Sequence, residues 1–164
     1  MRDGFLKAAA LSPALRVADC VYNTQQIIAQ LKDAAARGVK LAVFPEFCLT
    51  GYTCGDLFLQ HTLQQGALTG LQSILDASRE LDVVALVGLP LLVRGKLYNV
   101  AAVLCCGRLL GLVPKTYLPN YGEFYEKRQF TPGSTEVEWV TVCGQQVPFG
   151  TSLLLRCCEM PSFV

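Results

Sequence analysis

The chain has 164 residues, of which 52% are hydrophobic and only 16% are charged. This composition excludes a disordered or linker-like chain, which would be rich in charge and poor in apolar residues. The 14 Lys and Arg residues nearly balance the 13 Asp and Glu residues, so the net charge is +1. We therefore expect a single folded domain that binds neither nucleic acid nor an anionic membrane surface.

The longest apolar stretch is too short to cross a membrane. It covers residues 83–93 and is interrupted by Gly88 and Pro90, whereas a spanning helix needs about 18 apolar residues. The first residues do not resemble a secretory signal, because residues 1–3 are barely basic and Lys7 interrupts the apolar residues that follow. These features predict a cytoplasmic protein without a membrane partner.

The cysteines predict free thiols rather than a disulfide framework. Two adjacent pairs, Cys105-Cys106 and Cys157-Cys158, stand in apolar, strand-like stretches. Neighbouring side chains of a strand point to opposite faces, so we expect no bridges within these stretches and a reducing compartment. His61 is the only histidine and no Cys-x-x-Cys pair is present, so the sequence predicts no metal site.

The first half of the chain predicts strands and helices in alternation. Ile27, Ile28 and Leu31 recur at helical spacing, and residues 39–44 are short, apolar and rich in strand formers, which is typical of a strand buried on both sides. In chain order we expect a strand at 5–11, a helix capped by Asn23 that ends at Gly38, a strand at 39–44, a helical turn capped by Asp56, a helix at 63–81 and a strand at 83–89.

The second half predicts an antiparallel continuation of the sheet. The strands at 96–105 and 108–113 form a hairpin, because the connection between them is too short for a crossover. Residues 118–130 have no period and predict a long loop, which in a compact domain is usually functional. Two further strands, at 137–142 and 152–157, are expected around a turn at 148–150. The whole order predicts an α/β layered domain with a mixed sheet.

Two charged residues directly follow strands that end in proline. Glu46 follows Phe44-Pro45, and Lys115 follows Val113-Pro114. Proline cannot donate to the sheet ladder, so each strand ends there, and the carboxyl ends of strands in α/β sheets are where catalytic groups gather. A charge that is partly buried costs several kcal/mol unless it is paired. We therefore expect the carboxylate and the ammonium to meet.

Three blocks of sequence carry a resemblance to a known family. They are FPEFCLTGY at residues 44–52 followed by GDLF at 55–58, PKTYLPNYGEFYEKRQF at 114–130, and PFGT at 148–151. Together they resemble the nitrilase, or carbon–nitrogen hydrolase, superfamily, and within it the glutaminase domains of glutamine-dependent NAD(+) synthetases. The resemblance covers essentially the whole chain and implies an α-β-β-α sandwich with mixed sheets, of which residues 1–164 are the incomplete N-terminal part.

The resemblance implies a Glu-Lys-Cys triad that cleaves a carboxamide through a thioester. In it Glu46 is the general base and Lys115 stabilises the oxyanion. Tyr121 is expected to contact a glutamine substrate, and Tyr52 and Phe124 to line its pocket. Glu126 either orients Lys115 by a hydrogen bond or is a surface charge.

The nucleophilic cysteine of the family lies in a Cys-Glu-Asp elbow. Cys157-Cys158-Glu159 imitates that elbow, but it comes too early and lacks the second acid. We therefore expect the nucleophile beyond residue 164 and both of these cysteines in the core, with Cys158 as the weaker alternative. A chain that lacks the nucleophile is expected to be catalytically silent.

The resemblance also implies partners. They are L-glutamine, a synthetase domain that uses ATP and Mg²⁺, and further copies of the chain in a homo-oligomer. No phosphate-binding loop is present in the sequence, so ATP and Mg²⁺ are assigned to the absent synthetase domain, with no cofactor or metal in this chain. Two alternatives stay open at this point: a stand-alone nitrilase-type amidase, and a truncated domain that only self-associates.

Overall fold

The structure is a computed structural model that describes residues 5–156. Seven strands form one sheet in the order β1-β2-β3-β4-β5-β7-β6. Their bounds are β1 Ala8–Ala10, β2 Leu41–Val43, β3 Val84–Val93, β4 Lys96–Cys105, β5 Arg108–Pro114, β6 Glu138–Val142 and β7 Gln145–Phe149. The helices are α1 Cys20–Ala36, the 3₁₀ helix η1 Tyr52–Leu59, α2 His61–Ala77 and the short α3 Glu126–Gln129.

The sheet changes from parallel to antiparallel along the chain, as predicted. Strands β1, β2 and β3 pair in parallel, whereas β3, β4 and β5 pair in antiparallel fashion. The hairpins turn on Arg94-Gly95, Cys106-Gly107 and Cys143-Gly144, and both residues of each pair have positive φ. Such turns match the right-handed twist of strands and so close tight hairpins. Strand β7 joins β5 through a single parallel pair, Leu112 with Phe149.

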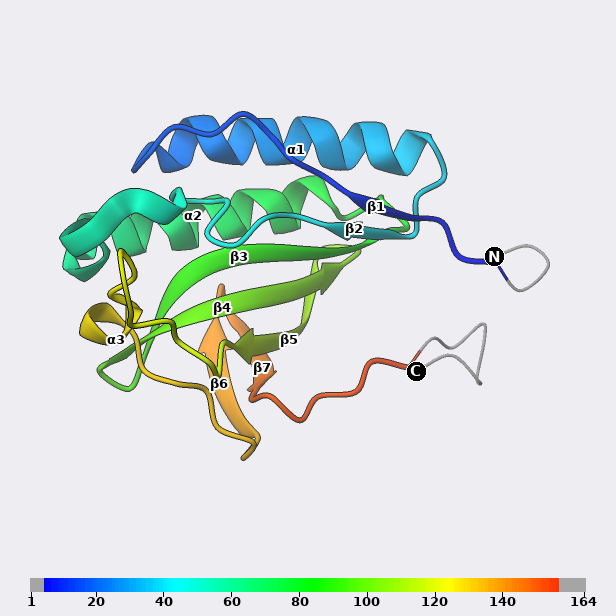
Figure 1. Cartoon of the computed structure of the whole chain (residues 1–164). Coiled ribbons are helices and arrows are strands. Elements are labelled where there is room, and N and C mark those ends of the chain that lie inside the picture. Colours follow the sequence, from blue (N-terminus) through cyan, green and yellow to red (C-terminus); the bar gives the residue numbers. More distant parts are fainter. Residues whose placement is uncertain (1–4, 157–164) are drawn as a thin grey trace.

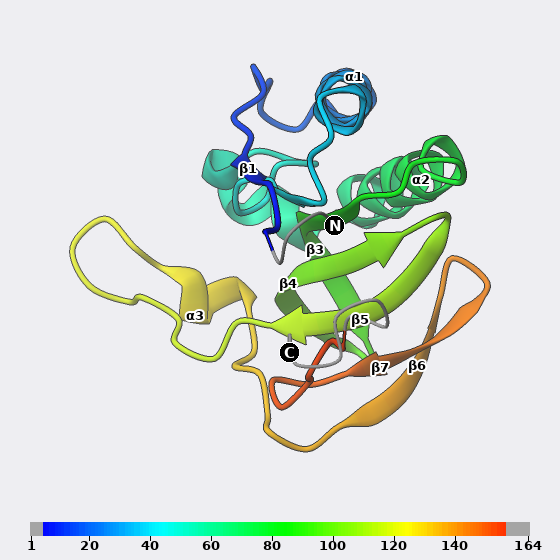
Figure 2. The ribbon, with the colours of Figure 1, turned by 90° about the vertical axis from the view of Figure 1, so that its right-hand side faces the viewer.

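Helices α1 and α2 lie side by side over one face of the sheet (Figures 1 and 2). Between helices and sheet the core contains fully buried aliphatic side chains, among them Leu31, Ile74 and Val87. Residues 5–156 thus form one helical layer on one mixed sheet, which agrees with the α/β class and the incomplete sandwich expected from the resemblance. Within the same residues, no helix is long and apolar enough to span a membrane.

Alternation along the strands leaves the other face of the sheet free of these helices. In β3, Ala85, Val87 and Leu89 belong to the core beneath α1 and α2, so the intervening Leu86 and Gly88 face the opposite side. The prediction that the second strand is buried on both sides is wrong, because α1 and α2 cover only one face of the sheet, where Ala42 is buried. Val43 of β2 is 40% exposed on the face without helices.

Helix α1 begins earlier than the sequence predicts. Its cap is Asp19 rather than Asn23, and the Asp19 carboxylate accepts a hydrogen bond from the Tyr22 N–H at 3.0 Å. Asn23 lies inside the helix and is fully buried, where its amide donates to the carbonyl groups of Arg16 and Leu49. Its side-chain oxygen, which a helix cap would use as an acceptor, instead accepts from the Arg16 N–H at 2.7 Å.

The C-terminal part of the sheet also differs from the prediction. The expected turn at 148–150 is largely strand β7, which pairs with β6 through the turn at Cys143-Gly144. Pro148 is tolerated inside β7 because the pairing with β5 is confined to Phe149, so its missing N–H interrupts no second ladder. The strand expected at 152–157 is wrong for residues 152–156, which form neither strand nor helix, and residue 157 lies outside the described residues.

The adjacent cysteines Cys105 and Cys106 are not on opposite faces of a strand. Cys105 ends β4, and Cys106 enters the turn with φ 49°, which brings the two sulfur atoms to 3.4 Å. Cys106 is exposed rather than a core residue. Within residues 5–156 all the cysteines are free thiols, as predicted, whereas the second adjacent pair at 157–158 is not described.

Candidate active site

Four neighbouring strands bring the predicted acid and amine together on the face without helices. The backbone N–H of Phe44, just after β2, donates to Leu86 of β3 at 3.0 Å, and Lys115 N–H donates to the carbonyl of Asn99 in β4 at 2.8 Å. These bonds fix the ends of β2 and β5 across the sheet. Lys115 Nζ then donates to Glu46 Oε1 at 2.8 Å. The predicted meeting of the two charges is present in the structure.

Lys115 is held by two carboxylates. Besides Glu46, its ammonium donates to Glu126 Oε1 at 3.0 Å, and the Glu126 side chain is only 6% exposed. Burial lowers the pKa of Lys115, but the hydrogen bonds and charges of Glu46 and Glu126 outweigh it, so the pKa lies above its ordinary value. Lys115 is therefore an ammonium at neutral pH, and Glu126 is a buried partner rather than a surface charge.

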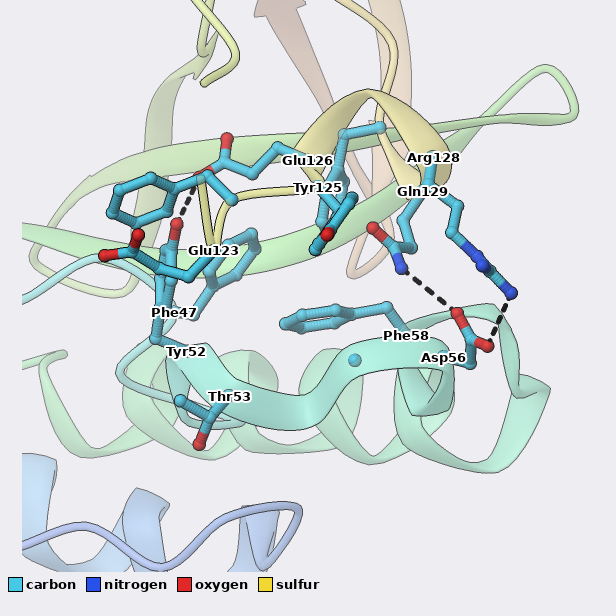
Figure 3. Close-up of a pocket in the computed structure, with 13 residues that line it drawn as sticks. Phe47, Tyr52, Thr53, Asp56, Phe58, Glu123, Tyr125, Glu126, Arg128 and Gln129 are labelled. Carbon is cyan, nitrogen blue, oxygen red and sulfur yellow. Dashed lines mark hydrogen bonds and ion pairs between the residues drawn. The ribbon is translucent and has the colours of Figure 1, made fainter. Parts of the chain in front are cut away.

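Tyr52 completes the support of Glu126. Its hydroxyl donates to Glu126 Oε1 at 2.7 Å (Figure 3). This oxygen therefore accepts from both Tyr52 and Lys115. Burial, then the hydrogen bond and the charge of Glu126, raise the pKa of Tyr52, which keeps the phenol protonated as a donor. The other oxygen of Glu126, Oε2, is buried and has no hydrogen-bond partner among the described residues.

Asn99 is a site residue that the sequence reasoning missed. It is 5% exposed, and its Nδ2 donates to Glu46 Oε1 while its backbone carbonyl accepts from Lys115. One residue of β4 therefore fixes the side chain of the acid and the backbone of the amine. The signal in the sequence is a single amide within the apolar strand 97–105.

Gly88 makes room for the turn that carries Glu46. A Cβ atom at this position would lie 2.5 Å from the Phe47 nitrogen and 2.7 Å from the Pro45 carbonyl oxygen. Both are backbone atoms, which cannot move away as the end of a flexible side chain can. The close approach of β3 to the 45–47 turn therefore requires glycine here.

We expect the Gly88→Ala substitution to destabilise the chain by about 1–3 kcal/mol, because overpacking forces the backbone apart. Urea unfolding measures this change. Gly111→Ala is the matched control, since its Cβ would meet the end of the flexible Leu153 side chain at 2.9 Å and the Pro148 carbonyl oxygen only at 4.0 Å. Equal losses of stability in both variants would contradict the requirement for glycine at position 88.

Two hollows adjoin the Lys115–Glu126 ion pair. The first is an open groove of about 360 Å³ on the sheet face without helices, and it is lined by Glu46, Asn99 and Lys115 among apolar side chains such as Val43. The second is a cavity of about 480 Å³ between η1 and the 123–130 segment, and Glu126 belongs to its wall. The ion pair thus separates a mainly apolar groove from a more polar cavity.

The aromatic residues predicted for the substrate pocket lie around the second cavity. Tyr52 and Phe124 line it, with ring centroids 6.4 Å apart in an edge-to-face arrangement. Tyr121 packs against Phe124 at 5.7 Å, but it is 72% exposed and is not part of the cavity wall. The structure therefore brings Tyr52 and Phe124 beside Glu126 and places Tyr121 at the outer edge.

Asp56 links the two walls of this cavity instead of capping a helical turn. The cap position of η1 is Gly51, without a side-chain bond. The Asp56 carboxylate accepts from Arg128 Nη2 at 2.8 Å and from Gln129 Nε2 at 3.1 Å, both on α3 (Figure 3). The predicted cap is wrong because this carboxylate is used to tie η1 to α3, a short helix within the segment that the sequence predicts as a loop.

No cysteine belongs to the groove within the described residues. Cys48, two positions after Glu46, is fully buried and its thiol contacts the Gly88 carbonyl at 3.6 Å. Burial raises its pKa to about 12, which keeps it a thiol. The alternative nucleophile Cys158 lies outside the described residues. Residues 5–156 therefore supply an acid and an ammonium, but no reactive sulfur beside them.

Sequence comparison relates the chain to a family of hydrolases. The family model described as carbon-nitrogen hydrolase matches residues 7–160. Glutamine-dependent NAD(+) synthetase from Mycobacterium tuberculosis is 38% identical over 163 residues, which are 99% of this chain and 24% of the relative. The synthetase of the same name from Thermotoga maritima is 39% identical over 125 residues, 76% of this chain and 21% of the relative. The chain thus spans about a quarter of these curated relatives.

Solved structures agree with this relationship. A glutamine-dependent NAD(+) synthetase from Cytophaga hutchinsonii matches with a TM-score of 0.83 and 27% identity over 88% of this chain and 25% of that one. An amidase from Nesterenkonia sp. matches with a TM-score of 0.68 over 90% of this chain and 56% of that one, and at 22% identity it shows the shared fold alone.

The mixed sheet carries helices on one face and a carboxylate–ammonium pair on the other. This arrangement defines an α/β protein of the nitrilase type. The chain belongs to the carbon–nitrogen hydrolase family. Curated relatives that match nearly the whole chain are glutamine-dependent NAD(+) synthetases, and the chain corresponds to roughly one quarter of them, in agreement with the resemblance seen in the sequence.

Proposed function

We propose that this chain contributes the acid and the ammonium of a glutamine amidohydrolase site that supplies ammonia to NAD(+) synthesis. The observation that carries the proposal is the 2.8 Å contact between Lys115 Nζ and Glu46 Oε1 at the edge of an open groove. The relatives' name, glutamine-dependent NAD(+) synthetase, supports glutamine as the substrate.

Glu46 acts as the general base. It takes the proton of a cysteine thiol that enters the groove from outside the described residues, and the thiolate adds to the amide carbon of glutamine. Glu46 then returns the proton to the amide nitrogen, ammonia leaves and a thioester forms. In the second half, Glu46 takes a proton from water, whose oxygen attacks the thioester carbon; the C–S bond then breaks, Glu46 returns the proton to the leaving sulfur, and glutamate and the free thiol are released. A protein of the same fold supports the sulfur chemistry, since a variant of the Nesterenkonia amidase carries the acetamide moiety of fluoroacetamide covalently at its active-site cysteine.

Lys115 stabilises the oxyanion that forms in both halves of the reaction. Its pKa lies above the ordinary lysine value, because two carboxylates accept from it, so at neutral pH it keeps its positive charge and is a poor proton donor. Glu126 and Tyr52 act on Lys115 by holding it in place. Tyr52, Phe124 and Tyr121 are the proposed contacts of the glutamine substrate.

The remaining parts of the activity belong to a synthetase domain of the relatives' kind. In the proposal, that domain uses ATP and Mg²⁺ to amidate deamido-NAD(+) with the ammonia released at Glu46 and Lys115. The described residues contain no group of three or more His, Cys, Asp or Glu side chains suited to a metal ion, so Mg²⁺ has no proposed ligand in this part of the chain. We further propose a cytoplasmic homo-oligomer.

A stand-alone amidase is the second candidate. The specific observation in its favour is the Nesterenkonia amidase, whose fold matches this chain over 56% of its own length. The identity to glutamine-dependent NAD(+) synthetases over 99% of the chain favours the first candidate. A domain that only self-associates would instead bind glutamine without releasing ammonia.

Ammonia release separates these candidates. We expect the longest natural polypeptide that contains this sequence to release ammonia from L-glutamine, and to consume it in an ATP-dependent amidation of deamido-NAD(+). The 164-residue chain alone is expected to release none, because no described cysteine adjoins Glu46. Hydrolysis of other amides but not of glutamine would favour the second candidate, and ammonia release by the short chain would contradict a nucleophile beyond it.

A further inference from the structure

The turn between β4 and β5 holds two thiols in contact. Cys105 Sγ and Cys106 Sγ lie 3.4 Å apart, although neighbouring side chains of a regular strand point to opposite sides. The contact arises because Cys106 has φ 49° and starts a two-residue turn with Gly107, φ 75°. Both cysteines are free; Cys105 is partly buried and Cys106 is exposed.

Hydrogen bonds from neighbouring elements fix this turn. Gly107 N–H donates to the Ser78 hydroxyl at 3.1 Å, and the Gln145 side chain donates to the Gly107 carbonyl at 3.1 Å. The Cys106 thiol itself contacts the Leu81 carbonyl at 3.5 Å. The conformation that brings the sulfurs together is therefore held by the ends of α2 and β7, and is not left to a free loop.

We propose that Cys105 and Cys106 form a redox modification site, a dithiol that closes reversibly into a disulfide between adjacent residues by exchange with low-molecular-weight disulfides such as glutathione disulfide. The proposal is independent of the proposed amidohydrolase function, because it uses neither Glu46 nor Lys115. It rests on the contact of the two sulfurs, the exposure of one of them and the fixed turn.

The exposed thiol reacts first. The Cys106 thiolate attacks one sulfur of glutathione disulfide, that S–S bond breaks and one glutathione thiolate leaves. Cys105 then loses its proton to solvent and its sulfur attacks the Cys106 sulfur, which expels the second glutathione. The two cysteines give up two electrons and two protons, and glutathione disulfide takes them up as two glutathione thiols. Burial and the neighbouring Cys106 raise the pKa of Cys105 to about 11, which agrees with Cys106 as the first nucleophile.

Backbone geometry makes the closed form easy to reduce. Adjacent Cα atoms across a trans peptide are ~3.8 Å apart, below the ~4.4–6.8 Å usual for disulfides, so the bond is strained and more reducible. Exposed or strained disulfides are the labile ones that serve regulation. Closure removes the Cys106 S–H proton, so the contact of this thiol with the Leu81 carbonyl is lost while the Gly107 bond to Ser78 persists.

Cys143 provides a matched control in the same chain. It stands in the β6–β7 turn with φ 50°, is followed by Gly144 and is partly buried, but its neighbour is Val142 rather than a second cysteine. Its thiol contacts the Leu68 carbonyl at 3.8 Å. The two turns therefore share their shape and differ in the number of thiols.

The test treats the 164-residue chain with glutathione disulfide, blocks the remaining thiols by alkylation, and analyses tryptic peptides by mass spectrometry. Residues 97–108 form one peptide whose only cysteines are Cys105 and Cys106, and residues 129–156 form another whose only cysteine is Cys143. We expect the 97–108 peptide to lose two hydrogens and to carry no glutathione. The 129–156 peptide is expected to stay alkylated or to gain one glutathionyl group.

Two variants assign the order of attack. In Cys105→Ser the 97–108 peptide is expected to keep one glutathionyl group, whereas in Cys106→Ser it stays unmodified over the time in which the wild-type peptide closes. Excess reduced glutathione is expected to restore alkylation of both wild-type thiols. The proposal is overturned if the wild-type 97–108 peptide gains glutathionyl groups, as the 129–156 peptide with Cys143 does, and forms no disulfide. It is also overturned if the disulfide persists in excess reduced glutathione. The comparison of the 97–108 and 129–156 peptides uses the unsubstituted chain alone, so it remains a test even if the two variants do not fold.

Discussion

Replacing Lys115 with Met is expected to lower the free energy of unfolding of this chain by about 3 kcal/mol at neutral pH. Removing one partner of a buried ion pair leaves an uncompensated charge, which costs ~3–5 kcal/mol. Here the stranded group is Glu126, whose side chain is 6% exposed. We take the lower end of the range because Lys115 is itself 30% exposed and therefore partly screened by water.

The pH of the measurement follows from the pKa of Lys115. Its pKa in the folded chain lies above the ordinary value of 10.5. A group with a raised folded pKa contributes stability that is fully present below the unfolded pKa and is lost as the pH rises through the folded value. The contribution of Lys115 is therefore complete at pH 7–8 and declines only above about pH 10.5. Urea unfolding at pH 7.5 measures it.

Two further variants show whether the stranded charge causes the loss. Lys115→Met combined with Glu126→Gln removes the unpaired charge and is expected to recover most of the lost stability. Lys127→Met, at an exposed lysine beside Glu126 in the sequence, is the matched control and is expected to change stability by less than about 0.5 kcal/mol. If the double variant is no more stable than Lys115→Met alone, the carboxylate of Glu126 is not the source of the loss.

The acid and the amine of the site could be predicted from local sequence. Glu46 and Lys115 each follow an apolar strand that ends in proline, and this local pattern places both at strand ends. Their meeting follows from sheet geometry in general and needs no exact register. Asn99 could not be found in this way, because its role depends on the register that pairs β4 with both β3 and β5.

Errors in the predicted elements arise where a residue with strong local preferences is used in tertiary contacts. Asn23 and Asp56 are good cap residues in isolation, but Asn23 bonds to Arg16 and Leu49, and Asp56 bonds to α3. Pro148 favours a turn locally, yet it lies in β7, because the pairing of β7 with β5 is confined to Phe149 and requires no N–H donor at position 148. In each case the deciding contact is distant in sequence, so local pattern could not reveal it.

The same carboxylates serve both stability and the proposed chemistry. The bond from Lys115 to the buried Glu126 helps to fix the ammonium, while Glu46 shares its Oε1 between Lys115 and Asn99. Neither of these bonds engages Glu46 Oε2. The arrangement therefore anchors Glu46 through one oxygen, and the other is available to accept a proton from a thiol or from water.

Replacing Glu46 with Gln is expected to lower kcat for ammonia release from glutamine by about 10²–10⁴, the usual contribution of a general base. The experiment uses the longest natural polypeptide that contains this sequence. Gln retains a carbonyl oxygen that accepts from Asn99 and Lys115, so the geometry persists while the base is lost. We expect kcat and kcat/KM to fall together with little change in KM, because the lost interaction acts in the transition state.

A control and a second variant make this result specific to the proposed role. Glu80→Gln, at an exposed position beyond α2, removes the same charge away from the groove and is expected to leave kcat unchanged. Lys115→Met is expected to cost about 10²–10³ in kcat as a lost oxyanion donor, and the double variant less than the product of both losses, because residues that act as one unit are not additive. A Glu46→Gln enzyme within tenfold of the parent would place the base elsewhere and leave the Glu46–Lys115 pair with a structural role only.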